Sequence, residues 1–305
     1  MEIVSKNGLD LEALYSRYVD FTDVRAKSQD TYRKAVKQFL GYLNARGIRE
    51  PNRLDVMAFK NALEESGKKP ATIRLYIAAV RGFFKWLDME GIYKNIAANV
   101  KAAKIEKSFK KDYLTSAQAK ALLLSMKRET LEEKRNFALV LLSITTGLRT
   151  VEISRANLED LRPVGDYTAL FIQGKGKDEK ADFVKIAPKT EEAIRDYLNA
   201  RGHVSGSSPL FGGVGNRHQG GRLTTRSISG VEKGALIAAG LISDRLTAHS
   251  LRHTAATLNL QNGGTLEETK QLLRHANINT TLIYAHALER ANNKSEARIE
   301  GALGI

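Results

Sequence analysis

Hydrophobic side chains in the first 92 residues recur with the period of amphipathic helices. From Leu11 onward, apolar residues stand three and four positions apart, which places them on one face of a helix. The same spacing returns three times, and a glycine follows each later stretch, where it commonly ends a helix. The pattern predicts four helices, which begin near Leu11, Ser28, Leu54 and Pro70. Four helices without a catalytic cluster are typical of a compact binding bundle.

Beyond residue 113 the pattern combines helical stretches with one pair of β-rich runs. Residues 169–172 and 183–186 are joined by turn formers, which predicts a hairpin. Residues 204–222, rich in glycine and serine, indicate a loop. The fold class expected is mainly α with a small antiparallel β-sheet. Helical periods are found over residues 115–127, 133–146, 227–240 and 249–262, and a further helix that follows Arg149 is expected to carry Val151, Ile153 and Leu158.

The segment between these two regions has lost the apolar period and is rich in lysine. A capping-box pattern from Thr115 to Gln118 then predicts the start of a new helix, so a domain boundary is expected close to residue 112. The predicted division is a helical binding domain over residues 1–92, a basic linker over 93–113, and a second domain with a C-terminal helix over 114–305.

Composition narrows the classes of function. The 305 residues carry a formal net charge of +14, which favours a polyanionic partner such as nucleic acid, although a solvated basic surface remains an alternative. The absence of cysteine excludes disulfides, thiolate catalysis and cysteine-based zinc sites. No apolar run approaches the roughly 18 residues of a membrane span, and the N-terminus has no signal-peptide core. We expect a soluble, cytoplasmic protein without a membrane partner.

Basic residues in several parts of the chain are candidates for contacts with DNA. Two lysines precede the fourth helix, where a helix N-terminus favours phosphate, and others follow along that helix, in the linker and in the glycine-rich loop. A charged face in water explains any single one equally well. The candidates are Lys68, Lys69, Arg74, Arg81, Lys101, Lys104, Arg217 and Arg222.

The densest group of reactive side chains lies in residues 249–286. His249, Arg252 and His253 stand one helical turn apart and share a face. His275 follows a second helix, and Tyr284 lies nine residues further on. Several basic groups close to one tyrosine are typical of a site for a phosphate.

Three chemistries compete for this group. Two histidines four residues apart suggest zinc, but Ser250 stands where a zinc hydrolase needs glutamate, so no metal is expected. A structural role, with a histidine buried in hydrogen bonds, would explain any one of these histidines. It explains less well why three of them lie close to two arginines. In phosphoryl transfer, fixed guanidinium groups stabilise charge on the non-bridging oxygens, and a positive site favours the tyrosine phenolate. A tyrosine nucleophile retains the bond energy, so no cofactor is required.

Two further motifs fit phosphoryl transfer. Arg149 follows the helix-ending Gly147, and Glu152 is close enough to pair with it and fix its geometry. A surface ion pair is the alternative. Lys175 lies between two glycines in the hairpin turn, where it can reach a neighbouring groove or remain merely exposed.

Together these motifs resemble the tyrosine recombinases, the phage-integrase and Xer-like group. The matching stretches are TGLRTVEI, GKGK in a β-turn, HSLRH, and LLRH followed by Tyr284, in the order and at the separations usual for the family. The helical N-terminal region looks like the family's core-binding domain. The resemblance implies an α+β catalytic domain, and the short N-terminus suggests the simpler Xer-like layout.

The resemblance also assigns roles. Arg149 and Arg252 would bind the scissile phosphate, Lys175 would protonate the leaving 5′-hydroxyl, and Tyr284 would form a 3′-phosphotyrosine. His249 and His275 would assist proton transfer and phosphate contact, while Glu152 and His253 would support them. Arg274, where many members carry glycine, is a departure that adds positive charge.

By the same resemblance, four protomers would act on two duplexes at inverted-repeat half-sites, as a site-specific recombinase for integration or Xer-like resolution. A helix within residues 285–305 would dock on a neighbouring protomer. Two alternatives stay open: a type IB topoisomerase with the same chemistry, and a non-catalytic DNA-binding regulator.

Overall fold

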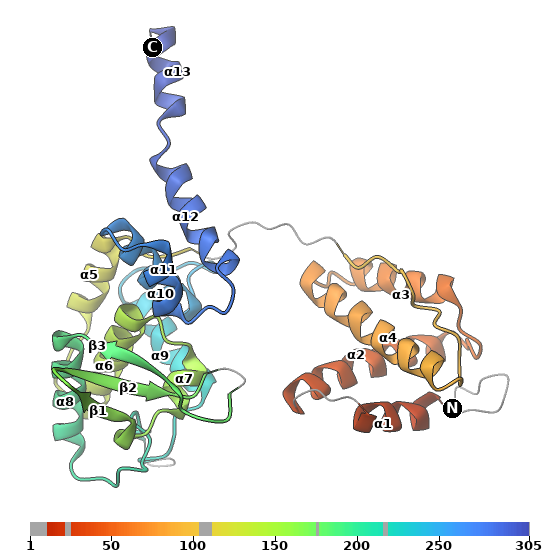
Figure 1. The fold of residues 1–305 in the computed structure, drawn as a ribbon, viewed down its shortest axis with the longest axis horizontal. Coiled ribbons are helices and arrows are strands. Elements are labelled where there is room, and N and C mark those ends of the chain that lie inside the picture. Colours follow the sequence, from red (N-terminus) through yellow and green to blue (C-terminus); the bar gives the residue numbers. More distant parts are fainter. Residues whose placement is uncertain (1–10, 22–25, 104–111, 175–176, 216–218, 305) are drawn as a thin grey trace. The chain divides into compact units, whose positions relative to one another are not determined.

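The chain forms two compact units, Met1–Ser108 and Phe109–Ile305, which are considered separately. The structure is a computed structural model that describes residues 11–21, 26–103, 112–174, 177–215 and 219–304. The first unit contains the four predicted helices, which are therefore confirmed (Figure 1). Their bounds are α1 Leu11–Phe21, α2 Ala26–Ala45, α3 Arg53–Glu65 and α4 Pro70–Met89.

Local signals explain where these helices begin. The Asn52 side chain caps α3 and its partner Asp55 bonds back to the Asn52 backbone, which satisfies two otherwise unpaired N–H groups. Pro70 begins α4, where a missing N–H costs nothing and its φ suits a helix. Both signals are local and can be read in the sequence, as can the apolar period that located the helices.

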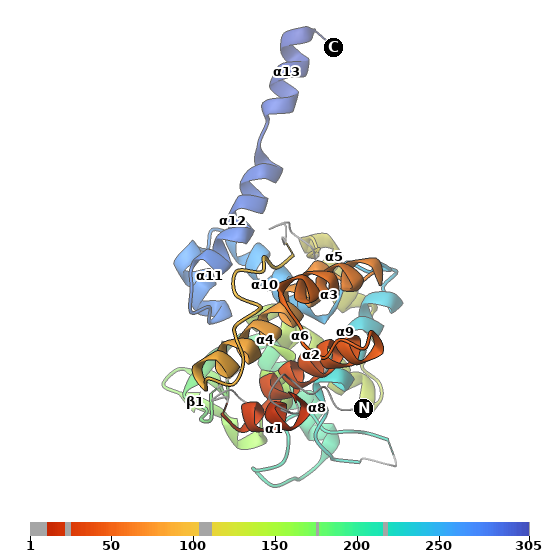
Figure 2. The same cartoon turned by 90° about the vertical axis from the view of Figure 1, so that its right-hand side faces the viewer.

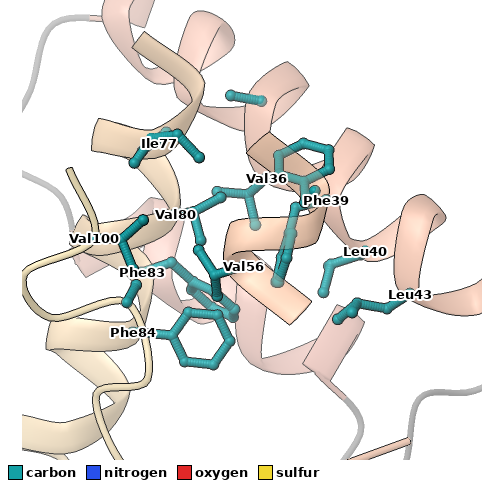
Figure 3. Close-up of a cluster of buried hydrophobic side chains, with 14 of the residues drawn as sticks. Val36, Phe39, Leu40, Leu43, Val56, Ile77, Val80, Phe83, Phe84 and Val100 are labelled. Carbon is teal, nitrogen blue, oxygen red and sulfur yellow. The ribbon is translucent and has the colours of Figure 1, made fainter. Parts of the chain in front are cut away.

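The core of the first unit lies between α2, α3 and α4 (Figure 3). Val36, Phe39 and Phe84 are completely buried, and the Phe39 and Phe59 rings meet edge to face with centroids 5.1 Å apart. Each such side chain stabilises the fold by about 1.5–3 kcal/mol when fully buried. The first unit thus has a hydrophobic core of its own.

The second unit surrounds α6 with helices and adds a small sheet (Figure 1). Its central helix α6 packs against α8, α9 and α10. In chain order the helices are α5 Ser116–Ser125, α6 Leu131–Thr146, α7 Thr150–Arg155, the 3₁₀ turn η1 Leu158–Asp160, α8 Pro188–Arg201, α9 Thr225–Ala238, α10 Ala248–Gln261, α11 Leu266–Leu273, α12 Asn279–Asn292 and α13 Ser295–Leu303.

The sheet is antiparallel with strand order β1-β2-β3, which confirms the expected fold class. The predicted hairpin is formed by β2 Tyr167–Ile172 and β3 Asp182–Ile186, with Leu170 opposite Val184. Three elements were not predicted: strand β1 Leu161–Val164, the 3₁₀ turn η1 and helix α8. Strand β1 is short and carries Pro163, which is tolerated because β1 lies at the edge of the sheet.

One placement from the apolar pattern is wrong. The pattern extends the helix that follows Arg149 as far as Leu158, but α7 ends at Arg155. Ala156 turns to an extended conformation with ψ 134°, and Leu158 begins the 3₁₀ turn instead. The chain starts a new element there because the Asn157 backbone N–H donates to the carboxylate of Asp160, which caps the 3₁₀ turn.

The chain ends in two consecutive helices. Helix α12 packs on α10 and α11, whereas α13 projects away from the rest of the second unit in the two perpendicular views (Figures 1 and 2) and has no buried residue. None of the helices in the described ranges is long and apolar enough to cross a membrane.

Candidate active site

The end of α6 positions the first arginine. Gly147 adopts a left-handed conformation with φ 59°, and a Cβ atom there would lie 2.7 Å from Leu273 Cδ2 and 3.3 Å from Ala255 Cβ. Glycine is therefore required both for the turn and for the close approach of α10 and α11. The turn places Arg149 at the N-cap of α7.

Glu152 holds Arg149 in place. Its Oε2 accepts the Arg149 backbone N–H at 2.8 Å and its Oε1 accepts Arg149 Nη1 at 2.9 Å, so the predicted pairing is confirmed. Burial would raise the pKa of the Glu152 carboxyl, but Arg274 and Arg149 outweigh burial and hold that pKa below its usual value. Glu152 is thus ionised, and its interactions fix the direction of the Arg149 guanidinium.

Arg252 connects three elements. It projects from α10, is buried, and donates from Nη1 to the Gly147 carbonyl and from Nη2 to the Leu273 carbonyl. Burial, together with the guanidinium groups of Arg149 and Arg274, lowers its pKa to about 9, which leaves it charged at neutral pH. A buried, fully charged guanidinium next to Arg149 creates a strongly positive site.

Tyr284 reaches this site from α12. Its hydroxyl lies 2.6 Å from Nδ1 of His253, and the His253 ring meets the His249 ring edge to face at 4.9 Å. Burial lowers the pKa of His253 to about 4, with smaller contributions from His249 and the other neighbouring basic groups. Its ring is therefore neutral and can accept the phenol proton at Nδ1. Burial also raises the pKa of Tyr284 to about 12, against the opposing influence of Arg252.

His275 follows the end of α11. Its Nδ1 is 2.9 Å from Oγ1 of Thr281, a buried hydroxyl on α12. Burial, followed by Arg252 and Arg149, lowers the pKa of His275 to about 4, and the same causes lower the pKa of His249. All three histidines near Tyr284 are therefore neutral at pH 7 and able to take up or pass on a proton.

A cleft of about 650 Å³ opens beside the cluster. Arg149, Arg274 and His275 line one side, and Gly174 and Lys177 line the side formed by the hairpin. The predicted general acid between these two hairpin residues, at position 175, lies outside the described residues, and its role stays a prediction.

The structure thus brings together most of the predicted catalytic residues. Electrostatic interactions link Tyr284, His249 and His275 to both Arg149 and Arg252, and link His253 to Arg252. These residues come from separate elements: Arg149 directly precedes α7, His249, Arg252 and His253 lie in α10, His275 follows α11, and Tyr284 lies in α12. Their catalytic roles remain predictions, since geometry alone shows proximity.

The predicted DNA contacts fall into three groups. Lys69, Arg74 and Lys101 are exposed and Lys68 is half-buried, as a contact requires. Arg81 and Arg222 are held by protein groups. The Arg81 guanidinium binds the Val100 carbonyl, and that of Arg222 binds the Ser154 and Ala156 carbonyls and the Asn157 side chain. Lys104 and Arg217 lie outside the described residues.

Sequence reasoning missed one member of the cluster, Thr281, and the partner of another, Arg274. Thr281 was not singled out, and its position three residues before Tyr284 on one helix was the available signal. Arg274 was noted only as added charge, whereas its Nη2 donates to Oε2 of Glu152 at 3.0 Å. No local signal indicates that contact, because it joins residues far apart in the chain.

Comparison with known proteins agrees with this geometry. Residues 112–290 match the model of the phage integrase family, and residues 14–91 match the N-terminal SAM-like domain of phage integrases. The chain is 31% identical to the tyrosine recombinase XerD of Oceanobacillus iheyensis over 77% of each protein. It is 33% identical to the tyrosine recombinase XerC of Herpetosiphon aurantiacus over 84% of this chain and 83% of that relative.

Solved structures share the fold. The XerH recombinase bound to palindromic difH DNA superposes with a TM-score of 0.72 at 21% identity, over 98% of this chain and 85% of XerH. The lambda integrase tetramer bound to a Holliday junction gives 0.69 at 19% identity, over 92% of this chain and 79% of that protein. From the family match and the sequence relatives, the chain belongs to the phage integrase family, as a tyrosine recombinase of the Xer type.

Proposed function

We propose that this recombinase cleaves and rejoins DNA strands at specific sites, with Tyr284 as its nucleophile. Tyrosine recombinases are enzymes of DNA strand cleavage and rejoining, so the reaction class follows from the family. The observation that supports the choice of residue is the position of the Tyr284 hydroxyl, 2.6 Å from His253 Nδ1, in a cluster that contains Arg149 and Arg252.

The reaction exchanges one phosphodiester for another. The Tyr284 oxygen attacks phosphorus, the bond to the 5′-oxygen of the next nucleotide breaks, and a 3′-phosphotyrosine forms. A neutral base accepts the phenol proton, and His253 is the base in contact with the Tyr284 hydroxyl. The departing 5′-oxygen takes a proton from Lys175. Attack by a 5′-hydroxyl reverses each step and rejoins a strand without any cofactor.

The two arginines stabilise the transition state. Negative charge grows on the non-bridging oxygens during attack, and guanidinium groups held close to the reacting phosphate stabilise that charge. Arg252 is fixed by two backbone carbonyls and Arg149 by Glu152. His249 and His275 complete the contacts to phosphate.

The Tyr284 hydroxyl lies in a buried environment that opposes its ionisation. Only 4% of Tyr284 is exposed, and its pKa of about 12 disfavours the phenolate. We infer that DNA binding shifts the start of α12 so that Tyr284 meets the phosphate. Arg252 and Arg149 then stabilise the negative charge that the attacking tyrosine oxygen brings to phosphorus.

The proposed partner is double-stranded DNA with inverted-repeat half-sites, on which the chain assembles as a tetramer in the cytoplasm. Two fold neighbours, a recombinase bound to a palindromic site and an integrase tetramer bound to a Holliday junction, support this proposal. The exposed helix α13 would dock on the next protomer. The charge of +14 suits the DNA partner.

A covalent-capture experiment tests the function and selects the DNA site in one step. The chain is incubated with nicked duplexes of randomised sequence, and DNA that stays attached in detergent is recovered and sequenced. We expect an enriched inverted repeat from the wild type, none from Tyr284→Phe, and an unchanged result from the control Tyr167→Phe. Absence of an adduct from the wild type would refute the proposal, while adducts of random sequence with relaxation of supercoils would favour a topoisomerase.

A further inference from the structure

The residue before His275 is an arginine in an unusual backbone conformation. Arg274 ends α11 with φ 53° and ψ 47°, in the left-handed region that costs a non-glycine residue about 1–2 kcal/mol. Glycine adopts this conformation without that cost. A strained position of this kind indicates that the side chain contributes something that the backbone alone does not.

The Arg274 side chain reaches across the second unit to Glu152. Its Nη2 donates to Glu152 Oε2 at 3.0 Å, and its Nη1 donates to the Leu272 carbonyl at 2.6 Å. The side chains of Arg274 and Glu152 are only 12% and 1% exposed. Water and salt therefore screen this ion pair far less than a surface pair.

Glu152 has two cationic partners with different access to the cleft. Oε1 accepts from Arg149 Nη1, while Oε2 accepts from the Arg149 backbone and from Arg274. Both arginines line the cleft, but the Arg149 side chain is 28% exposed and that of Arg274 only 12%, so Arg149 is the guanidinium that a phosphate can recruit more easily. When the Arg149 guanidinium turns towards phosphate, Oε1 of Glu152 loses its hydrogen bond from Arg149 Nη1. A buried carboxylate without any cationic partner is strongly disfavoured.

We propose that Arg274 is a positioning residue that keeps the buried charge of Glu152 compensated while the Arg149 guanidinium engages the scissile phosphate. The inference rests on the proposed function, because that function assigns Arg149 to phosphate. Arg274 acts through Glu152 and does not itself touch DNA. Without it, phosphate has to compete with the carboxylate of Glu152 for the Arg149 guanidinium.

The other carboxylates that line the cleft have lysine partners, and the charge of Asp182 also favours the charged form of Arg274. The carboxylate of Asp182 binds Lys177 at 2.7 Å, and Glu267 binds Lys270 at 3.0 Å. Lys270 lines the same cleft but contacts Glu267 rather than Glu152. It therefore provides a matched control that removes one positive charge from the cleft without changing the environment of Glu152.

A double-mutant cycle tests the proposal. The substrate is the nicked duplex enriched by covalent capture, and the measurement is the single-turnover rate of adduct formation at saturating DNA. We expect Arg274→Met to slow this rate about 10- to 100-fold, with an unchanged half-saturating DNA concentration. In a Glu152→Gln background the same substitution should change the rate less than about threefold, because the residue through which it acts has gone.

Further variants separate charge from backbone. Arg274→Gly relieves the left-handed strain and should be as slow as Arg274→Met, while Arg274→Lys should retain most of the rate. Lys270→Met should have the same effect with and without Glu152. Equal effects of Arg274→Met in both backgrounds, or a wild-type rate for Arg274→Gly, would overturn the proposal. If the wild type forms no adduct, the proposed function fails instead.

Discussion

Replacing Glu152 by glutamine should destabilise the second unit and leave the first unchanged. Glutamine keeps the shape of the side chain but removes the charge that compensates Arg149 and Arg274. Removing one partner of a buried ion pair costs about 3–5 kcal/mol, and the partial exposure of Arg149 places our expectation near the lower end, about 3 kcal/mol. With a urea m-value of about 2–3 kcal/mol/M, the midpoint should fall by about 1 M or more.

The chain contains an internal reference for this measurement. Trp86, in α4, is its single tryptophan, so tryptophan fluorescence follows the first unit, whereas far-ultraviolet circular dichroism follows the helices of both. Glu152→Gln should shift the dichroism transition of the second unit without moving the fluorescence transition. The exposed control Glu267→Gln, which breaks a surface pair, should cost less than about 1 kcal/mol. Equal losses for the two variants would refute the buried-charge reasoning.

Three further predictions follow from the same geometry. Gly147→Ala should destabilise the chain by about 2–4 kcal/mol, because it adds overpacking against Leu273 to left-handed strain; Gly165→Ala, with a similar φ but open space, should cost about 1 kcal/mol in the same urea titration. Burial lowers the pKa of His253 and His275 from 6.5 to about 4, so the unfolded chain binds more protons than the folded chain between pH 4 and 6.5. The contribution of these histidines to stability is therefore complete above about pH 6.5 and is lost as pH falls towards 4. Urea midpoints across this window should show the loss, and His253→Gln should make it shallower. Deletion of residues 291–305 should weaken assembly on DNA more than binding of one half-site, as gel-shift titrations would show; unchanged assembly would contradict the proposed docking of α13.

Sequence patterns predicted contacts that are local in the chain. The pairing of Arg149 with Glu152 spans three residues of one turn, and the capping box from Thr115 to Gln118 is equally local, so both can be read directly. Helix periods located most elements for the same reason. Strand β1 was not predicted because it is short, and helix α8 was not predicted because its apolar face is weak, with only a few buried positions.

Contacts between distant segments could not be predicted in this way. The role of Arg274 depends on a left-handed backbone that directs its side chain toward Glu152, and no residue near it in the sequence reveals that direction. The 2.6 Å contact of His253 with Tyr284 depends on how α12 packs on α10. Sequence identified these residues as a group by their chemistry, while their pairings required the fold.

The residue that carries the DNA tests the central claim most directly. The covalent adduct can be digested with nuclease and trypsin, and the modified peptide can be identified by mass spectrometry. Cleavage after Arg274 and Arg290 releases residues 275–290, in which Tyr284 is the single tyrosine. We expect the nucleotide remnant on that peptide, at Tyr284. A remnant attached to any other residue, or an adduct that persists in Tyr284→Phe, would contradict the account.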